Sequence, residues 1–136
     1  KKSIYYHKFL KIMKNFANLL VLMVALEHFY ILYIEMFAWT TLGRKIFRGA
    51  LEDELFEKTR GLAANQGLYN GFLAAGLVWS FFITNAEWSF NVQIFFLACV
   101  IIAAIFGAVR SSKSILFKQG FPAIFAILIV LFAHYA

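Results

Sequence analysis

The sequence is poor in charge, in proline and in cysteine. Only 15% of its 136 residues are charged, and it contains one proline, Pro122, and one cysteine, Cys99. A lone cysteine excludes an intrachain disulfide framework. Eight glycines are too few for a collagen-like repeat, and the dominance of apolar residues argues against a disordered chain.

Apolar residues take the place of the missing charge. They make up 62% of the chain, with seventeen phenylalanines, whereas a soluble domain is roughly half apolar and a quarter charged. This composition predicts that lipid surrounds the protein, and the length allows a single domain over residues 1–136. The net charge of +6 comes from basic residues that flank the apolar runs, which suits contact with anionic membrane lipids better than contact with nucleic acid.

Four apolar stretches are each long enough to cross a hydrocarbon core of about 30 Å, which takes roughly 20 helical residues. The connections after the second and third stretches are short, so neighbouring helices must run antiparallel. The predicted fold is therefore all-α, an integral membrane protein built as an antiparallel four-helix bundle. Its predicted spans are residues 16–39, 61–83, 90–109 and 115–135.

Two amphipathic segments flank the first span. In residues 3–14, basic and apolar side chains fall on opposite sides of a helix, which predicts a short N-terminal helix lying on the bilayer surface. In residues 40–60, apolar residues recur at helical spacing, which predicts an interfacial helix between the first two spans. The alternative for the second segment is a solvated connector whose charges follow no pattern.

The positive charges do not decide the membrane orientation. Eight lysines and arginines flank the first and third connections, which favours a cytoplasmic location for both. The amino-terminal tail argues for the opposite orientation, because it carries five lysines: Lys1, Lys2, Lys8, Lys11 and Lys14. Both orientations stay open at this point.

The first span carries three titratable side chains, Glu27, His28 and Glu35. An ionisable side chain near the bilayer centre costs on the order of 2.5 to 3.5 kcal/mol, so such groups rarely face lipid. At about 100° per residue, the three side chains fit within an arc of roughly 100° on one side of the helix. We expect this side to face the protein interior.

The second span carries a matching polar arc of amide and phenol side chains at i, i+4 spacing: Asn65, Gln66, Tyr69 and Asn70. With a rise of about 1.5 Å per residue, Asn65 lies near the depth of Glu35. Asn70 lies near the depth of Glu27 and His28 by the same arithmetic. The two polar faces are in register, which predicts that they share a cavity.

The fourth span adds Lys118 and Gln119 near the level of Glu35. Lys118 either pairs with Glu35 or extends to the lipid headgroups. Gln119 completes a predicted polar cavity between the first, second and fourth helices. The predicted ligand-binding residues are Glu27, His28, Glu35, Asn65, Gln66, Tyr69, Asn70 and Gln119.

Small residues form a further face of the second span, opposite the polar arc: Ala63, Gly67, Gly71, Ala74 and Ala75. The Gly67-x-x-x-Gly71 spacing lets another backbone approach closely, either from a neighbouring helix or from a second copy of the chain. Because four helices enclose little volume, we expect a homodimer.

The third span has no comparable polar face. Gln93 lies near one end, Cys99 has apolar neighbours in the sequence, and we expect this helix only to close the bundle. No His-x-x-x-His spacing and no cysteine pair supports a metal site, and no cofactor motif occurs, so we expect neither a metal nor a cofactor.

Three strings resemble an uncharacterised bacterial family of small four-helix membrane proteins, domain of unknown function 1304. They are ALEHFYILYIEMFAW at 25–39, ANQGLYNGFLAAGLVW at 64–79 and QGFPA at 119–123. The likeness covers nearly the whole chain after about Asn15, and the basic tail is longer than the usual start of the family. The resemblance implies four membrane helices and a multi-pass location in a bacterial inner (plasma) membrane. It implies no activity.

Three functions stay open. A ligand-binding protein or carrier for a small amphipathic or cationic molecule would use Glu27, with exchange of a proton for the ligand as a simple coupling mechanism. A membrane enzyme on a lipid-soluble substrate would use Glu27 or His28 in acid-base chemistry. A structural or assembly subunit would use the same polar groups only to hydrogen-bond helix to helix.

Overall fold

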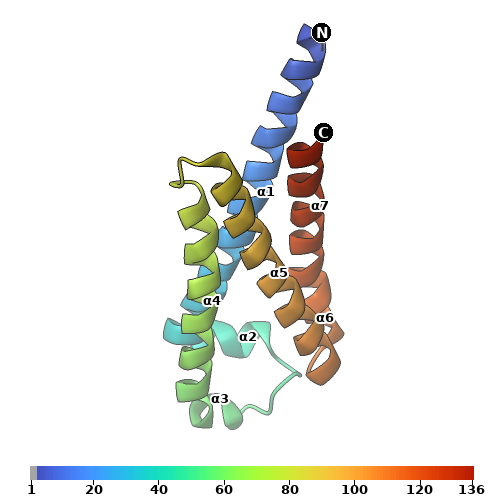
Figure 1. Ribbon diagram of the computed structural model, residues 1–136. Helices are drawn as coiled ribbons and strands as arrows, with labels where there is room; N and C mark the ends of the chain where they lie inside the picture. The colour runs from blue at the N-terminus through green and yellow to red at the C-terminus, as the bar shows by residue number, and fades with distance from the viewer. Residues whose placement is uncertain (1–2) are drawn as a thin grey trace.

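The computed structural model describes residues 3–136, and the regular structure in this part of the chain is helical (Figure 1). Two lysines of the predicted basic tail, Lys1 and Lys2, lie outside the described residues. The long helices are α1 (Ile4–Phe37), α4 (Arg60–Ser80), α5 (Ala86–Arg110) and α7 (Phe121–Tyr135). The shorter segments are η1 (Trp39–Gly43), α2 (Arg44–Ile46), α3 (Leu55–Lys58), α6 (Lys113–Ile115) and η2 (Leu116–Gly120), where η1 and η2 are π-helical.

Within residues 3–136, three helical stretches are long and apolar enough to cross a membrane: Ile4–Phe37, Ala86–Arg110 and Lys113–Tyr135. The last of these joins α6, η2 and α7 into one nearly continuous rod. The predicted second span forms α4 but is not among the three, because its polar arc and its glycines lower its hydropathy.

The long helices pack in a ring of contacts. Helices α1 and α5 each contact both α4 and α7, and the α1–α4 contact is the most extensive (Figure 1). The core consists mostly of small side chains, including Val21, Val24, Ala123 and Ala126. Large apolar side chains such as Phe72, Phe95, Phe106 and Phe117 are exposed instead. A small-residue core beneath an apolar exterior is the distribution that a lipid environment favours.

Glycines set the close approach of α4 to α1. A Cβ built at Gly67 would lie 2.9 Å from the Cβ of Glu35 and 3.2 Å from the carbonyl oxygen of Leu32. A Cβ at Gly71 would lie 2.3 Å from the flexible end of Leu32. Gly67 and Gly71 of the predicted small-residue face therefore pack against α1 of the same chain, whereas Ala75 of that face is exposed.

The prediction of a separate surface helix over residues 3–14 is wrong. Helix α1 continues without a break from Ile4 to Phe37, about 51 Å of helix. No glycine or proline occurs in this stretch. Its amino-terminal half also packs on α7, with the rings of Phe9 and Phe132 6.4 Å apart at their centroids. The first turns of α1 extend past the end of α7 in Figure 1.

The prediction of an interfacial helix over residues 40–60 is also wrong, since short helical turns replace it. The chain leaves helical geometry between α2 and α3, where Gly49 has a φ of 86°. This connector, residues 38–59, is nevertheless folded. Phe56 is only 1% exposed and lies 5.2 Å from the Trp39 ring centroid, and Arg44 forms an ion pair of 3.4 Å with Asp53.

The packing predicts unequal effects of enlarging two glycines of α4. Gly67→Leu should lower the free energy of unfolding by about 1–3 kcal/mol, because the backbone of α1 cannot move away cheaply. Gly61→Leu is the matched control, because a Cβ at Gly61 has no neighbour within 4 Å. Thermal unfolding of the purified variants in detergent measures the difference. Equal midpoints would contradict the close α1–α4 packing.

Candidate functional site

An open hollow of about 700 Å³ lies where α1, the connector and the turn from α5 into η2 meet. We call it the connector hollow. Its position follows from the path of the chain, because the connector crosses from the end of α1 toward α6 before returning to α3 (Figure 1). The hollow is lined by Glu27, Tyr30, Ile31, Ile34, Ile46, Phe47, Arg48, Gly49, Ala50, Ser111, Ser112, Ser114, Ile115, Lys118 and Gln119.

The connector hollow combines apolar walls with charges of both signs. Glu27 is partly buried, whereas Arg48 and Lys118 are exposed. Within residues 3–136, neither cation forms an ion pair with Glu27. Three serines add hydroxyl groups, and the Oγ atoms of Ser112 and Ser114 lie 2.8 Å apart. The hollow therefore offers one anionic group, two cationic groups and hydroxyls beside an isoleucine-rich wall.

Glu35 lies on another side of α1 and binds α4. The Nδ2 atom of Asn70 donates a hydrogen bond of 2.8 Å to Oε2 of Glu35, and a longer one of 3.3 Å to the backbone oxygen of Gln66. The side chains that α1 presents to Gly67 come from the same turns, 32–36. The Glu35–Asn70 hydrogen bond thus belongs to the helix contact and not to the connector hollow.

His28 is buried, with 1% of its surface exposed. Its Nδ1 atom lies 2.8 Å from the backbone oxygen of Val24, one turn earlier on the same helix. That distance suits donation by the protonated Nδ1 of a neutral ring. The Nδ1 atom of His28 is therefore bound within α1, and His28 does not line the connector hollow.

The remaining predicted residues of α4 point outward. Asn65, Gln66 and Tyr69 are exposed, and Tyr69 lies against Phe72 of its own helix at 6.2 Å between ring centroids. The glycines of the small-residue face occupy the contact with α1. The polar arc adjoins this face and does not lie opposite it as predicted, and most of the arc is turned away from α1. Asn70 is the exception because it borders the small-residue face and reaches Glu35.

The eight predicted site residues therefore lie in several environments. Glu27 and Gln119 line one hollow, and Lys118 lies with them and forms no ion pair with Glu35 in the described structure. Sequence reasoning did not include Arg48 or the serines at 111, 112 and 114, although the basic and hydroxyl residues of both connections were the available signal.

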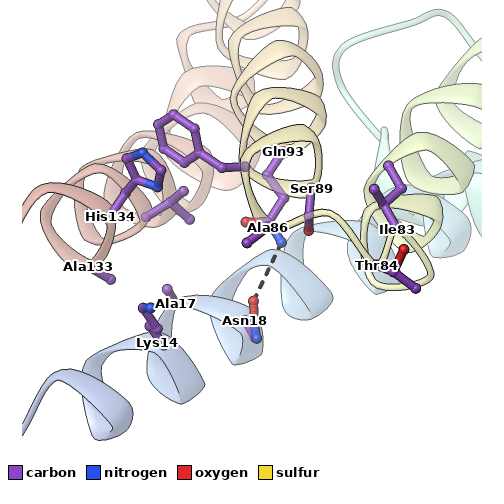
Figure 2. A pocket seen from close by; sticks show the side chains of 12 residues that line it. Lys14, Ala17, Asn18, Ile83, Thr84, Ala86, Ser89, Gln93, Ala133 and His134 are labelled. Carbon is purple, nitrogen blue, oxygen red and sulfur yellow. Dashed lines mark hydrogen bonds between the residues drawn. The ribbon is translucent and has the colours of Figure 1, made fainter. Parts of the chain in front are cut away.

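A second hollow, of about 310 Å³, lies at the opposite end of the molecule between α1, α5 and the end of α7 (Figure 2). We call it the end hollow. Gln93 is only 6% exposed there, and its Nε2 atom donates to Oδ1 of Asn18 at 3.4 Å. The ring of His134 stacks on Phe90 at 3.7 Å. The prediction that the third span only closes the bundle is incomplete, because Gln93 of that span meets a polar residue of α1.

The comparisons with known proteins give a family but no activity. The family described as "Protein of unknown function (DUF1304)" matches residues 22–131. "Uncharacterized protein YpaA" of Lactococcus lactis subsp. lactis (strain IL1403) is 34% identical over 111 residues, which cover 81% of this chain and 92% of that protein. No solved structure matches.

The Glu35–Asn70 hydrogen bond predicts a measurable coupling between two residues. In a double-mutant cycle of Glu35→Ala and Asn70→Ala, the coupling free energy should be about 0.6–1.7 kcal/mol, the range of interhelical hydrogen bonds in membranes. The same cycle with Asn65→Ala serves as control and should be additive, because Asn65 is exposed. Unfolding in detergent measures both cycles, and additivity at Asn70 would exclude the bond.

Proposed function

The chain belongs to the DUF1304 family of proteins of unknown function, and from this premise we propose that it is a multi-pass membrane protein that binds or carries a small amphipathic molecule in the connector hollow. One observation carries the proposal: the partly buried Glu27 carboxyl faces a hollow of about 700 Å³ without a cationic partner in the described chain. That volume lies within the roughly 300–1,000 Å³ typical of small-molecule sites.

Helix α4 is proposed as a fourth span. Its 21 residues extend about 31 Å, close to the thickness of the hydrocarbon core. Its long contact with α1, which is itself apolar enough to cross a membrane, supports a parallel path through the lipid. The proposed molecule is thus an antiparallel four-helix bundle in a bacterial plasma membrane, and the bacterial source of its relative supports the bacterial part of this proposal.

The outward polar arc of α4 supports a homodimer. Asn65, Gln66 and Tyr69 are exposed, and amide groups that face lipid without partners are unfavourable. Amide side chains both donate and accept hydrogen bonds, so the arc of one copy is complementary to that of another. A second copy packed on this arc satisfies these groups within the membrane.

The chemistry of the connector hollow suggests the kind of ligand. Ile31, Ile34 and Ile115 offer an apolar surface, as a hydrocarbon chain requires. Arg48 and Lys118 attract an anionic group, and Glu27 attracts a cationic one. A zwitterionic amphiphile that carries both charges on a short headgroup fits this arrangement.

Proton coupling is the finer part of the proposal. Beside apolar side chains, a carboxyl group is favourable either in its protonated, neutral form or as a carboxylate whose charge is balanced by a paired cation. Glu27 would therefore release a proton as the cationic group of the ligand arrives, and take it up again as the ligand leaves. Ligand movement and proton movement in opposite directions would follow.

A structural or assembly role is the second candidate, and the Glu35–Asn70 hydrogen bond and the hydrogen bond of the His28 Nδ1 atom within α1 favour it for those residues. The structural role and the ligand-binding role differ in what they predict for Glu27, which has no hydrogen bond to another helix within the described residues. Under the structural role, Glu27→Gln should leave ligand binding absent or unchanged.

A fluorescent lysophosphatidylcholine is a suitable probe of the ligand-binding proposal, because it carries one acyl chain, a phosphate and a quaternary ammonium. The Glu27→Gln variant should bind this probe at least about tenfold more weakly than the original protein, because the cationic end loses its partner. Native mass spectrometry of the purified protein in detergent measures the bound fraction across a titration.

Glu57→Gln is the matched control, because Glu57 is exposed on α3 and does not line the hollow. It should bind the probe as the original protein does. An unchanged affinity in Glu27→Gln, or an equal loss in Glu57→Gln, would contradict the proposal. In proteoliposomes with a pH gradient, loss of probe movement in Glu27→Gln alone would support the coupling.

A further inference from the structure

The end hollow has a polar lining that the proposed function does not use. Lys14 and Asn18 contribute from successive turns of α1, Ser89 and Gln93 from α5, and His134 from α7 (Figure 2). These residues lie at the amino-terminal half of α1 and at the start of α5, whereas the connector hollow lies beside the carboxyl-terminal half of α1 and the end of α5. The two hollows are therefore separate.

Gln93 is the unusual member of this lining. Its side chain is almost entirely buried, and a buried polar group needs hydrogen-bond partners. Its amide nitrogen reaches Asn18 at 3.4 Å, a long hydrogen bond for a buried amide. This bond uses one amide proton of Gln93 and none of Asn18, so both side chains keep a donor for a ligand in the hollow that they line.

The charges at the end hollow favour an anion. Lys14 is the cation on the α1 side, and no ion pair occupies it within the described part of the chain. The nearby carboxylate, Glu87, is engaged by His134, with 3.4 Å between its Oε2 atom and Nε2 of the ring. A cation without an ion pair beside amide donors is a set of groups that binds an oxyanion.

We propose that the end hollow binds a phosphate or carboxylate group through Lys14, Asn18 and Gln93. The hydroxyl of Ser89 at its wall already donates to the backbone oxygen of Ser80 at 2.7 Å and is not a donor to the anion. The apolar side chains of Phe90 and Val130 surround the remainder of the ligand. At about 310 Å³ the hollow accommodates an anionic headgroup or a small organic phosphate, but no complete phospholipid. The anion is either free in solution or the exposed headgroup of an anionic lipid, and both present the same chemistry.

Calorimetric titration of the purified full-length protein in dodecyl maltoside with inorganic phosphate tests the site, and a parallel titration with short-chain phosphatidic acid tests the lipid source. Lys14→Met should weaken the binding at least about tenfold. Lys14 is exposed, so its replacement leaves the fold intact and the result interpretable. Gln93→Leu should weaken it as well, with its thermal unfolding measured first.

Two matched variants control for charge and position. Lys11→Met removes a lysine one turn away on α1, and Asn91→Leu removes an exposed amide of α5, and neither residue lines the hollow. Both should bind as the original protein does. Binding of phosphatidic acid alone, lost in Lys14→Met, assigns the anion to lipid and supports the proposal. Absence of binding to both probes, or equal losses in Lys11→Met and Lys14→Met, would overturn it.

Discussion

The close contact between α1 and α4 determines where the polar side chains of both helices lie. It depends on Gly67 and Gly71, which have no side chain to keep the two backbones apart. Because this face of α4 is committed to α1, Asn70 at its border reaches Glu35, and the rest of the polar arc is turned outward. On α1, the same contact takes Glu35 and leaves Glu27 to the connector hollow.

The positions of the helices follow from composition and length, because long apolar runs can only satisfy their backbone groups as helices in lipid. Helix α1, which contains the predicted first span, begins twelve residues before residue 16, at Ile4, since an amphipathic run can either form a separate surface helix or continue a longer one. The contact of Phe9 with Phe132 of α7 favours the continuous helix, and no local sequence pattern reveals this contact. The connector likewise leaves helical geometry at Gly49, and the Trp39–Phe56 contact across it joins residues that are seventeen positions apart in the sequence.

The candidate site was accessible from the sequence in part. Charge within an apolar run identifies Glu27 and Glu35. Depth arithmetic pairs Glu35 with Asn65 and Glu27 with Asn70, whereas in the structure Asn70 bonds to Glu35, so the predicted register of the two helices is wrong. The sequence does not show that the polar side of α1, an arc of about 100°, faces two different neighbours. Glu35 contacts α4, whereas Glu27 lines the connector hollow. Arg48 lines the hollow because the connector folds back against α1, and Gln93 of α5 hydrogen-bonds to Asn18 of α1. Both contacts join distant parts of the sequence, so the periodicity of a single segment does not predict them.

The central claim is that α1 carries one carboxyl group packed against α4, that of Glu35, and one that faces the connector hollow, that of Glu27. A lipid-soluble carbodiimide tests this claim most directly, because the reagent modifies carboxyl groups that it can reach in apolar surroundings. Mass spectrometry of the labelled protein should show modification of Glu27 that lysophosphatidylcholine suppresses. Glu35, bonded to Asn70 against α4, should react much more slowly. Preferential labelling of Glu35, or labelling of Glu27 that the amphiphile leaves unchanged, would contradict the account.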